Sequence, residues 1–538
     1  MKSVVVVLGA VALAAVGMAF TRDTSSDAQK PLPAPDQHSN FFKPDESVTN
    51  GMVTVEGGSV SYQAVAGTLV IHAKDHDDVE GNTEKPKETK DNEAEASMFY
   101  VAYMRRGGDT STRPITFLFN GGPGSSSVWL HMGAFGPKRV VTMDDSHTPA
   151  APYKVVNNDY SLLDASDLVF VDAPGAGFSR IAGKDKEKAF YGVDPDAHAF
   201  TEFVTAFLSK YGRWNSPKYL FGESYGTPRA AGMSWDLQND KAIDLNGVIL
   251  LSQILNFDLS PDGPDSNPGM DLPYALALPT YAATALYHHK VPGSVNDVQK
   301  FAQSAEQFAM TDYLRALSIG TSISPAQKLA IANRLHGFTG LPVSYILKAN
   351  LRIDGGMFEK NLQDDAGMTT GRLDTRFSGP SIDPLSKEAD YDPQSAAISS
   401  AYVSAFNDYA RKVLNYGQDK VYKPEIDVFK YWEFKHQQPN TGFANPGTPN
   451  LMPDIATTMK TNPQLHVMVN GGYFDLATPY YEGWYEMHHL PIPDKLAGNI
   501  EYHYYPSGHM VYAHEDSLKA LHDNVANFIR NTANNQAH

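Results

Sequence analysis

The sequence predicts an α/β protein built on a mostly parallel central sheet with helices on both faces. Short apolar runs, typical of strands buried on both faces, recur at 115–119, 168–171, 247–251 and 466–469. Stretches of helical spacing separate these runs. Strands that alternate with helices predict parallel β-α-β units. Since 538 residues exceed one ordinary compact core, we expect one large domain with an insertion, or two domains.

Further strands, a loop and two N-terminal segments are expected ahead of these runs. Residues 58–72 and 97–106 alternate or run apolar, as strands do. The intervening residues 74–96 are crowded with Asp, Glu and Lys, which predicts a solvated loop. Residues 20–45 are polar and proline-bearing, which predicts a disordered spacer. Residues 1–19 carry a lysine and an apolar run ending in small residues, which predicts an export signal and a periplasmic or extracellular protein; an uncleaved anchor is the alternative.

The composition and the hydrophobic pattern of the sequence change after residue 257. A stretch rich in Pro, Gly and Asp opens a region without clear strand patterns but with helical spacing. Within it, Ser324-Pro325 is typical of a helix start and Gly337 of a helix stop. The expected organisation is a first core segment, a largely helical cap insertion and a second core segment, at 46–257, 258–448 and 449–538.

Charge and composition exclude several classes of binding partner and of chemical site. With 44 Lys and Arg against 61 Asp and Glu, the net charge is −17, which argues against nucleic acid and anionic membranes. The absence of cysteine excludes disulfides, thiolate metal sites and a cysteine nucleophile. A zinc-protease motif begins at His514-Glu515, but Leu518 stands where the second histidine belongs. We expect no metal and no cofactor, and no membrane span after the export signal; homodimerisation is left open.

The strongest chemical signal is Gly222-Glu223-Ser224-Tyr225-Gly226, which lies between a short apolar run and a helix start. A serine on so sharp a strand-to-helix turn has a strained backbone, and glycine neighbours leave room for it. The turn holds the hydroxyl above the sheet, beside a helix N-terminus. Ser224 is therefore the candidate nucleophile, although the pattern alone also fits an ordinary glycine turn.

A serine nucleophile needs a base and an acid that orients the base. Asp475 follows the apolar run at 466–469, and His509 follows the strand-like residues 500–505. Both are expected on loops at the C-terminal ends of parallel strands, where the serine should also lie. A glycine-rich loop at 120–126 follows another strand, and consecutive glycines let backbone N–H groups approach an oxyanion.

Taken together, these motifs resemble the serine carboxypeptidase family. The resemblance rests on 120–126, the Asp-Ala-Pro-Gly-Ala-Gly-Phe-Ser run at 172–179, the serine motif at 222–226, Asp475 and Gly508-His509, in the family's order and at compatible spacings. It covers roughly 97–257 and 449–520. The absence of cysteine removes the disulfides common in the family's eukaryotic members and indicates a bacterial-type exported member. The resemblance implies an α/β-hydrolase fold and removal of single residues from peptides with a free C-terminus.

The resemblance also assigns site residues. It makes Ser224 the nucleophile, His509 the general base and then acid, and Asp475 the residue that orients the imidazole. The oxyanion hole uses the N–H groups of Gly122 and Tyr225. The terminal carboxylate of the substrate is bound by Asn120, Gly121 and protonated Glu223. Independently of the resemblance, a carboxyl beside the nucleophile in a partly buried cleft should have a raised pKa.

Two positions depart from the family pattern. Ser125 stands where the family has cysteine. More important, the family carries a second carboxylate-binding Glu two residues before a Gly-Pro pair, and alignment on Gly136-Pro137 places Ala134 there. Without a like-charged neighbour, Glu223 is expected to ionise at lower pH than in the family. An esterase, amidase or acyltransferase on the same triad is therefore an alternative, and a non-catalytic binding protein on this fold is a second one.

Overall fold

The structure is a computed structural model that describes residues 42–43, 45–74 and 93–534. The predicted export signal, most of the predicted spacer and most of the predicted loop at 74–96 lie outside these residues. Within the described residues, no helix combines the length and the hydropathy that crossing a bilayer requires.

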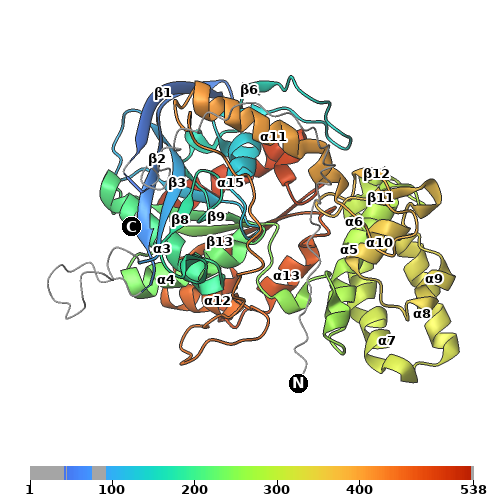
Figure 1. The fold of residues 1–538 in the computed structure, drawn as a ribbon. Helices are drawn as coiled ribbons and strands as arrows, with labels where there is room; N and C mark the ends of the chain where they lie inside the picture. Colours follow the sequence, from blue (N-terminus) through green and yellow to red (C-terminus); the bar gives the residue numbers. More distant parts are fainter. Residues whose placement is uncertain (1–41, 44, 75–92, 535–538) are drawn as a thin grey trace, which may run out of the picture.

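A ten-stranded sheet forms the core, in the order β1-β2-β3-β7-β4-β9-β10-β13-β14, with β8 paired to β3. The strands from β7 to β14 along this order run parallel, whereas β1, β2 and β3 pair antiparallel at one side. The predicted parallel sheet is thus confirmed, and the fold is that of the α/β hydrolases (Figure 1). The strands are β1 Glu46–Val55, β2 Gly58–His72, β3 Glu95–Arg105, β4 Ile115–Phe119, β7 Asp167–Val171, β8 Arg180–Ala182, β9 Lys218–Glu223, β10 Gly247–Leu251, β13 His466–Gly472 and β14 Ile500–Tyr505.

Helices cover both faces of this sheet because its central strands are apolar on both sides. One face packs against α3 (Val193–Tyr211), α4 (Gly226–Lys241) and α12 (Met452–Thr461). The other packs against α11 (Pro393–Lys412), α15 (Glu515–Asn534) and the π-helical turn η2 (Leu130–Phe135). Strands β4, β9 and β10 are buried at every residue. Burial of apolar area stabilises such a layered core at roughly 25 cal/mol per Å².

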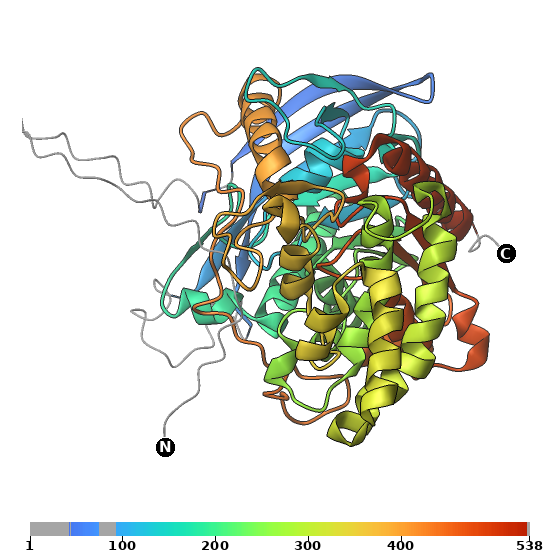
Figure 2. The same ribbon diagram turned by 90° about the vertical axis from the view of Figure 1, so that its right-hand side faces the viewer.

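The insertion contains a helical lobe beside the sheet. Figure 2, viewed from the lobe's side, shows its yellow-green helices in front of the core. Helix α5, almost entirely buried, is the lobe's centre, and its cluster includes Phe474 and Tyr480 from the segment after β13. The lobe therefore packs directly on the loop that carries Asp475. Its helices are α5 Leu272–Tyr287, α6 Val298–Phe308, α7 Leu314–Ile319, α8 Pro325–Thr339, α9 Val343–Lys348 and α10 Gly355–Asn361.

The helix start predicted at Ser324-Pro325 is confirmed, since Ser324 and Gln327 form a capping box at α8. The stop predicted at Gly337 is wrong. The helix continues to Thr339 and ends at Gly340, which adopts the left-handed conformation with φ of 71°. Gly337 has a helical backbone and open space around it, so the helix passes through it with only a modest loss of stability.

The rest of the insertion returns to the core. Short antiparallel strands β11 (Met368–Thr370) and β12 (Ser378–Pro380) flank residues 371–377. After α11, the chain forms bridges from Glu425 to Ser125 and from Lys423 to Gly177. The remaining strands and α-helices of the described residues are β5 Lys138–Val140, β6 Val155–Asn157, α2 Lys186–Phe190, α13 Tyr480–His488 and α14 Asp494–Ala497.

Candidate active site

Ser224 lies on a strained turn between β9 and α4. Its φ is 59°, in the left-handed region that a serine rarely adopts. The glycines on either side are required by sterics. A Cβ on Gly222 would lie 2.0 Å from the carbonyl oxygen of Gly226, and a Cβ on Gly226 would lie 2.8 Å from that of Phe119. The turn is therefore a nucleophile elbow at the C-terminal end of the central strand.

The glycine-rich loop after β4 packs against this elbow. A Cβ on Gly121 would lie 2.3 Å from the backbone nitrogen of Tyr225, so only glycine permits this approach. Gly122 has a φ of 103°, which also favours glycine. Among the hydrogen bonds of the described residues, none is donated by the N–H of Gly122 or of Tyr225. These two N–H groups are thus free to receive an anion near Ser224.

Asp475 and His509 form a buried pair. The Nδ1 atom of His509 lies 2.9 Å from Oδ2 of Asp475. The Asp475 carboxylate also accepts hydrogen bonds from the N–H of Ala477 and from the N–H and hydroxyl of Thr478. Burial alone would lower the pKa of His509, but the Asp475 carboxylate and its hydrogen bond raise it overall. The imidazole is therefore oriented through Nδ1 and made more basic.

The loop of His509 meets the serine turn through the end of β10. The N–H of Ser224 donates to Leu251 O at 3.0 Å, and the hydroxyl of the next residue, Ser252, donates to His509 O at 2.7 Å. Within the described residues, no hydrogen bond joins the Ser224 hydroxyl to His509. In substrate-free enzymes such bonds are often long and tighten when substrate binds. The structure thus brings all three predicted triad residues to one edge of the sheet.

Glu223 is buried immediately before the nucleophile. Its Oε2 atom accepts from Asn120 Nδ2 at 2.8 Å and from the Tyr512 hydroxyl at 2.9 Å, whereas Oε1 accepts from Tyr512 at 3.1 Å. Burial raises the pKa of Glu223 to about 7, against the lowering effect of His509 and of these hydrogen bonds. The raised pKa expected for Glu223 is therefore found, with burial as its largest cause. The expectation that Glu223 ionises at lower pH than in the family, for want of a second carboxyl, stays a prediction.

Ala134 is fully buried in η2. The preceding Gly133 packs between two tyrosines: a Cβ there would lie 2.6 Å from the Tyr402 ring and 2.7 Å from the Tyr512 ring. Small side chains in η2 are thus matched by large aromatic ones from α11 and from the loop after His509. Tyr512 was not predicted from the sequence, although it lies only three residues after His509.

Two further residues support the loop that carries Asn120. The Arg229 guanidinium is buried, donates to Asn120 O at 2.6 Å and pairs with Asp196 at 2.6 Å. Asp172 is fully buried and accepts hydrogen bonds from the N–H and hydroxyl of Ser127, both at 2.8 Å. The spacing of Arg229, five residues after Ser224, was visible in the sequence, but its partners were not.

Residues 371–377 of the insertion connect the loops that carry Asp475 and His509, contacts that sequence analysis missed. The N–H of His509 donates to Leu373 O at 2.6 Å, and the N–H of Leu476 donates to Arg372 O at 3.1 Å. The N–H of Thr375 in turn donates to Phe474 O at 2.9 Å. The loops of His509 and Asp475 are therefore held by one segment, the turn between β11 and β12, which we call the clamp segment.

Comparisons with known proteins show a similarity over part of the chain. The model of the family described as serine carboxypeptidase matches residues 88–256. Over these residues the chain is similar to the serine carboxypeptidase family. The match contains the glycine-rich loop and the serine elbow; Asp475 and His509 lie outside it.

Individual relatives agree. The chain is 30% identical to serine carboxypeptidase-like 33 of Arabidopsis thaliana over 168 residues, 29% of this chain and 32% of that protein. It is 32% identical to the pheromone-processing carboxypeptidase KEX1 of Yarrowia lipolytica over 141 residues, 26% of this chain and 21% of that protein. The chain thus spans about a third or less of these serine carboxypeptidase relatives. The solved structure of proline iminopeptidase from Mycobacterium smegmatis aligns with 90% of this chain and 99% of its own at 11% identity, with a TM-score of 0.33, too low to bear on function.

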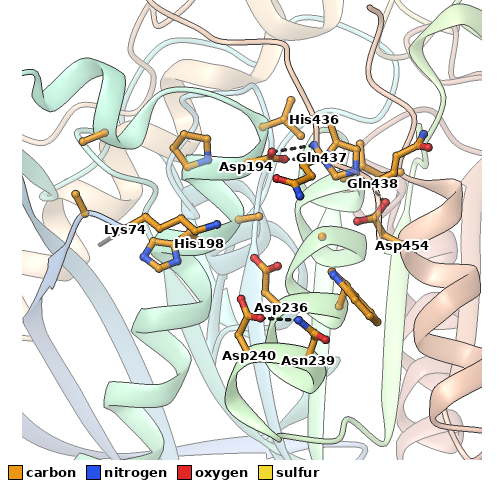
Figure 3. A pocket seen from close by; sticks show the side chains of 18 of the residues that line it. Lys74, Asp194, His198, Asp236, Asn239, Asp240, His436, Gln437, Gln438 and Asp454 are labelled. Atoms are coloured by element: carbon orange, nitrogen blue, oxygen red, sulfur yellow. Dashed lines mark hydrogen bonds and ion pairs between the residues drawn. The ribbon is translucent and has the colours of Figure 1, made fainter. Parts of the chain in front are cut away.

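Several acidic side chains away from the predicted site line a pocket of about 1210 Å³ (Figure 3). None of the predicted site residues lines this pocket. There, His436 lies between Asp194, at 2.6 Å from Nδ1, and Asp454, at 2.9 Å from Nε2. Asp236 and Asp240 of α4 line the same pocket. Among the described residues, one group of three has the spacing to hold a metal ion, and it contains no predicted site residue: Glu56, His522 and Asp523.

Proposed function

We propose that this protein is a serine-type carboxypeptidase that hydrolyses the C-terminal peptide bond of peptides through an acyl-enzyme on Ser224. The observation that carries the proposal is the strained elbow serine beside two unpaired N–H groups and a buried Asp–His pair. The match of residues 88–256 to the serine carboxypeptidase model supports a peptide hydrolase. The triad roles, the acyl-enzyme and the exopeptidase specificity are our inference from this geometry.

In the proposed acylation, the Ser224 hydroxyl oxygen attacks the scissile carbonyl carbon while His509 Nε2 accepts its proton. The carbonyl oxygen becomes an oxyanion that the N–H groups of Gly122 and Tyr225 bind. The C–N bond then breaks, and the leaving amine takes the proton from Nε2. In deacylation, water gives a proton to Nε2, attacks the ester and releases the shortened peptide, and the proton returns to Ser224. Asp475 orients the imidazole throughout.

The proposed exopeptidase specificity depends on recognition of a free carboxylate. Asn120 and Gly121 lie next to the elbow, and Glu223 is protonated below a pKa of about 7, so it donates a hydrogen bond to an anion. Above that pH the ionised Glu223 repels the substrate carboxylate. Carboxypeptidase activity is therefore expected to fall with a basic limb near pH 7.

A blocked dipeptide tests this proposal. N-acyl-Phe-Leu and its C-terminal amide are compared from about pH 4 to 8, with Ser224→Ala as the control for adventitious peptidase. Release of leucine from the acid but not from the amide, absent in Ser224→Ala, is the expected result. Equal cleavage of both, or cleavage of simple esters only, would instead assign an esterase, amidase or acyltransferase. No reaction of Ser224 with a fluorophosphonate would contradict catalysis altogether.

A further inference from the structure

The carboxyl of Glu223 has an unequal hydrogen-bond environment. Its Oε2 atom accepts from both Asn120 Nδ2, at 2.8 Å, and the Tyr512 hydroxyl, at 2.9 Å. Its Oε1 atom accepts only a longer bond from the same hydroxyl, at 3.1 Å. A carboxylic acid carries its proton on the oxygen that receives fewer donors, because a donor and an acid proton compete for the same lone-pair region. Oε1 is therefore the oxygen that can carry the proton and donate it onward.

We propose that Tyr512 is a positioning residue for recognition of the substrate's terminal carboxylate, holding Glu223 so that its Oε1–H donates to that anion. This inference rests on the proposed carboxypeptidase function and adds a residue to it. Tyr512 thereby supplies the support that a second acidic side chain at position 134 would otherwise give. A phenol suits this task because its pKa here lies well above 10, so it stays a donor at every pH at which a carboxyl would ionise.

The surrounding packing fixes the hydroxyl. Tyr512 and Glu223 are each only 3% exposed. The Tyr512 ring sits over Gly133, where a Cβ would come within 2.7 Å of it, and beside Tyr402. A larger residue at 133 would displace the ring from Glu223. The small residues of η2 thus leave the space that the Tyr512 ring occupies.

The pH dependence of this arrangement follows from the groups that face Glu223. These are His509 and Tyr512 from the loop after β14, Asp475 from the loop after β13, Tyr402 from α11, and Asn120. The Tyr512 hydrogen bond stabilises the ionised form of Glu223 and so lowers its pKa. Removing the hydroxyl should raise that pKa, which moves the basic limb of activity upward even though binding of the carboxylate becomes weaker.

The experiment compares Tyr512→Phe with wild type on N-acyl-Phe-Leu and on an uncharged ester substrate, each across pH. We expect an increase of about tenfold in KM for the acid, an upward shift of the basic limb of kcat/KM, and little change for the ester. Tyr505→Phe is the matched control, because this buried tyrosine donates to Asn470 at 2.9 Å and does not contact Glu223.

A double variant separates positioning from general destabilisation. In a Glu223→Gln background, Tyr512→Phe should cause no further shift of the basic limb, because the group that titrates is gone. An unchanged KM and limb in Tyr512→Phe would overturn the inference, as would equal losses on acid and ester. If wild type itself does not cleave the acid, the proposed function fails instead, so the two failures are distinguishable.

Discussion

Two histidines of this protein lie against buried aspartates, and they differ in what is left free. His509 binds Asp475 through Nδ1, and no hydrogen bond of Nε2 is found among the described residues. His436 binds carboxylates through both nitrogens, Asp194 at Nδ1 and Asp454 at Nε2. Burial would lower the pKa of His436, but its hydrogen bonds to the two carboxylates raise it to about 9. The Asp475–His509 pair thus leaves Nε2 available for proton transfer, whereas both nitrogens of His436 are bound to carboxylates.

The comparison teaches that a buried Asp–His pair is not by itself a catalytic site. A general base must be able to give up its proton near the working pH, which an imidazolium held between two carboxylates does not do. His509 also has Ser252 and the serine turn beside it, whereas His436 faces a pocket lined by further acids, including Asp236 and Asp240. The proposed triad differs from the pair at His436 because a strained serine and unpaired N–H donors lie beside it.

The largest expected difference is between the two aspartates. Asp475→Asn should lower kcat by about 10⁴-fold, because the amide favours the wrong imidazole tautomer. Asp454→Asn should leave kcat within about twofold but lower the free energy of unfolding by about 3 kcal/mol, since it breaks a buried ion pair. Steady-state kinetics on N-acyl-Phe-Leu and urea unfolding measure the two quantities.

The two variants should thus differ in which quantity they lose: kcat in Asp475→Asn and stability in Asp454→Asn. A strong loss of kcat in Asp454→Asn with unchanged stability would place His436 in the chemistry and erase the distinction. Fluorophosphonate labelling provides an independent control, because it reports the reactivity of Ser224 without requiring a substrate carboxylate. Labelling should be slowed in Asp475→Asn and unaltered in Asp454→Asn.

The sequence was most informative where local sterics dictate residue type. The glycines around Ser224 and at 121–122 are required by close backbone approaches of neighbouring turns, so their pattern survives in the sequence. The central parallel strands were visible as apolar runs because both of their faces are buried, which favours apolar side chains at successive positions. The error at Gly337 arose because a glycine inside a helix costs only about 1 kcal/mol, and packing of α8 outweighs that loss.

Contacts between distant segments could not be predicted in the same way. Tyr512 donates to a carboxyl 289 residues earlier in the chain, and the clamp segment bonds to loops more than 100 residues later. No periodicity or motif encodes such pairings, because they depend on how the insertion folds back on the core. Arg229 stands five residues after Ser224 in the sequence, but its bond to Asn120 O required the structure.

The clamp segment gives the next largest expected effect. A Cβ on Gly508 would lie 2.4 Å from Cβ of Asp374, which is fully buried and paired with Arg376 at 2.6 Å. Gly508→Ala should therefore displace His509 rather than the clamp segment, lowering kcat by about 10²-fold, as a misplacement of about 1 Å can do, with little change in KM. Steady-state kinetics on N-acyl-Phe-Leu measure both constants.

Gly442→Ala is the matched control, because a Cβ at Gly442 meets nothing within 4 Å. It should leave kcat, KM and stability close to wild type. A Gly508→Ala variant with wild-type kcat would show that the His509 loop accommodates the extra methyl group. That result would disprove our inference that the clamp segment controls the position of His509.

The smallest effect on activity is expected at His436, where pH should act on stability instead. Its pKa is raised from 6.5 to about 9 in the folded state, so its stabilising contribution is complete below pH 6.5 and is lost as pH rises through 9. At 1.36 kcal/mol per pKa unit this contribution is about 3 kcal/mol. The unfolding free energy of wild type minus that of His436→Gln should therefore decline between these pH values.

This pH window separates the two histidines in one protein sample. The basic limb of kcat/KM, which we ascribe to Glu223 with a pKa of about 7, should be identical in wild type and His436→Gln, because His436 does not contact the triad. Unfolding by urea at a series of pH values gives the stability difference, and the dipeptide assay gives the limb. A shift of the limb, or a stability difference that is constant across the window, would mean that His436 is not held as an imidazolium between its two aspartates. A titratable imidazole at His436 would be available for proton transfer, so its second carboxylate would no longer explain why we propose His509, and not His436, as the base.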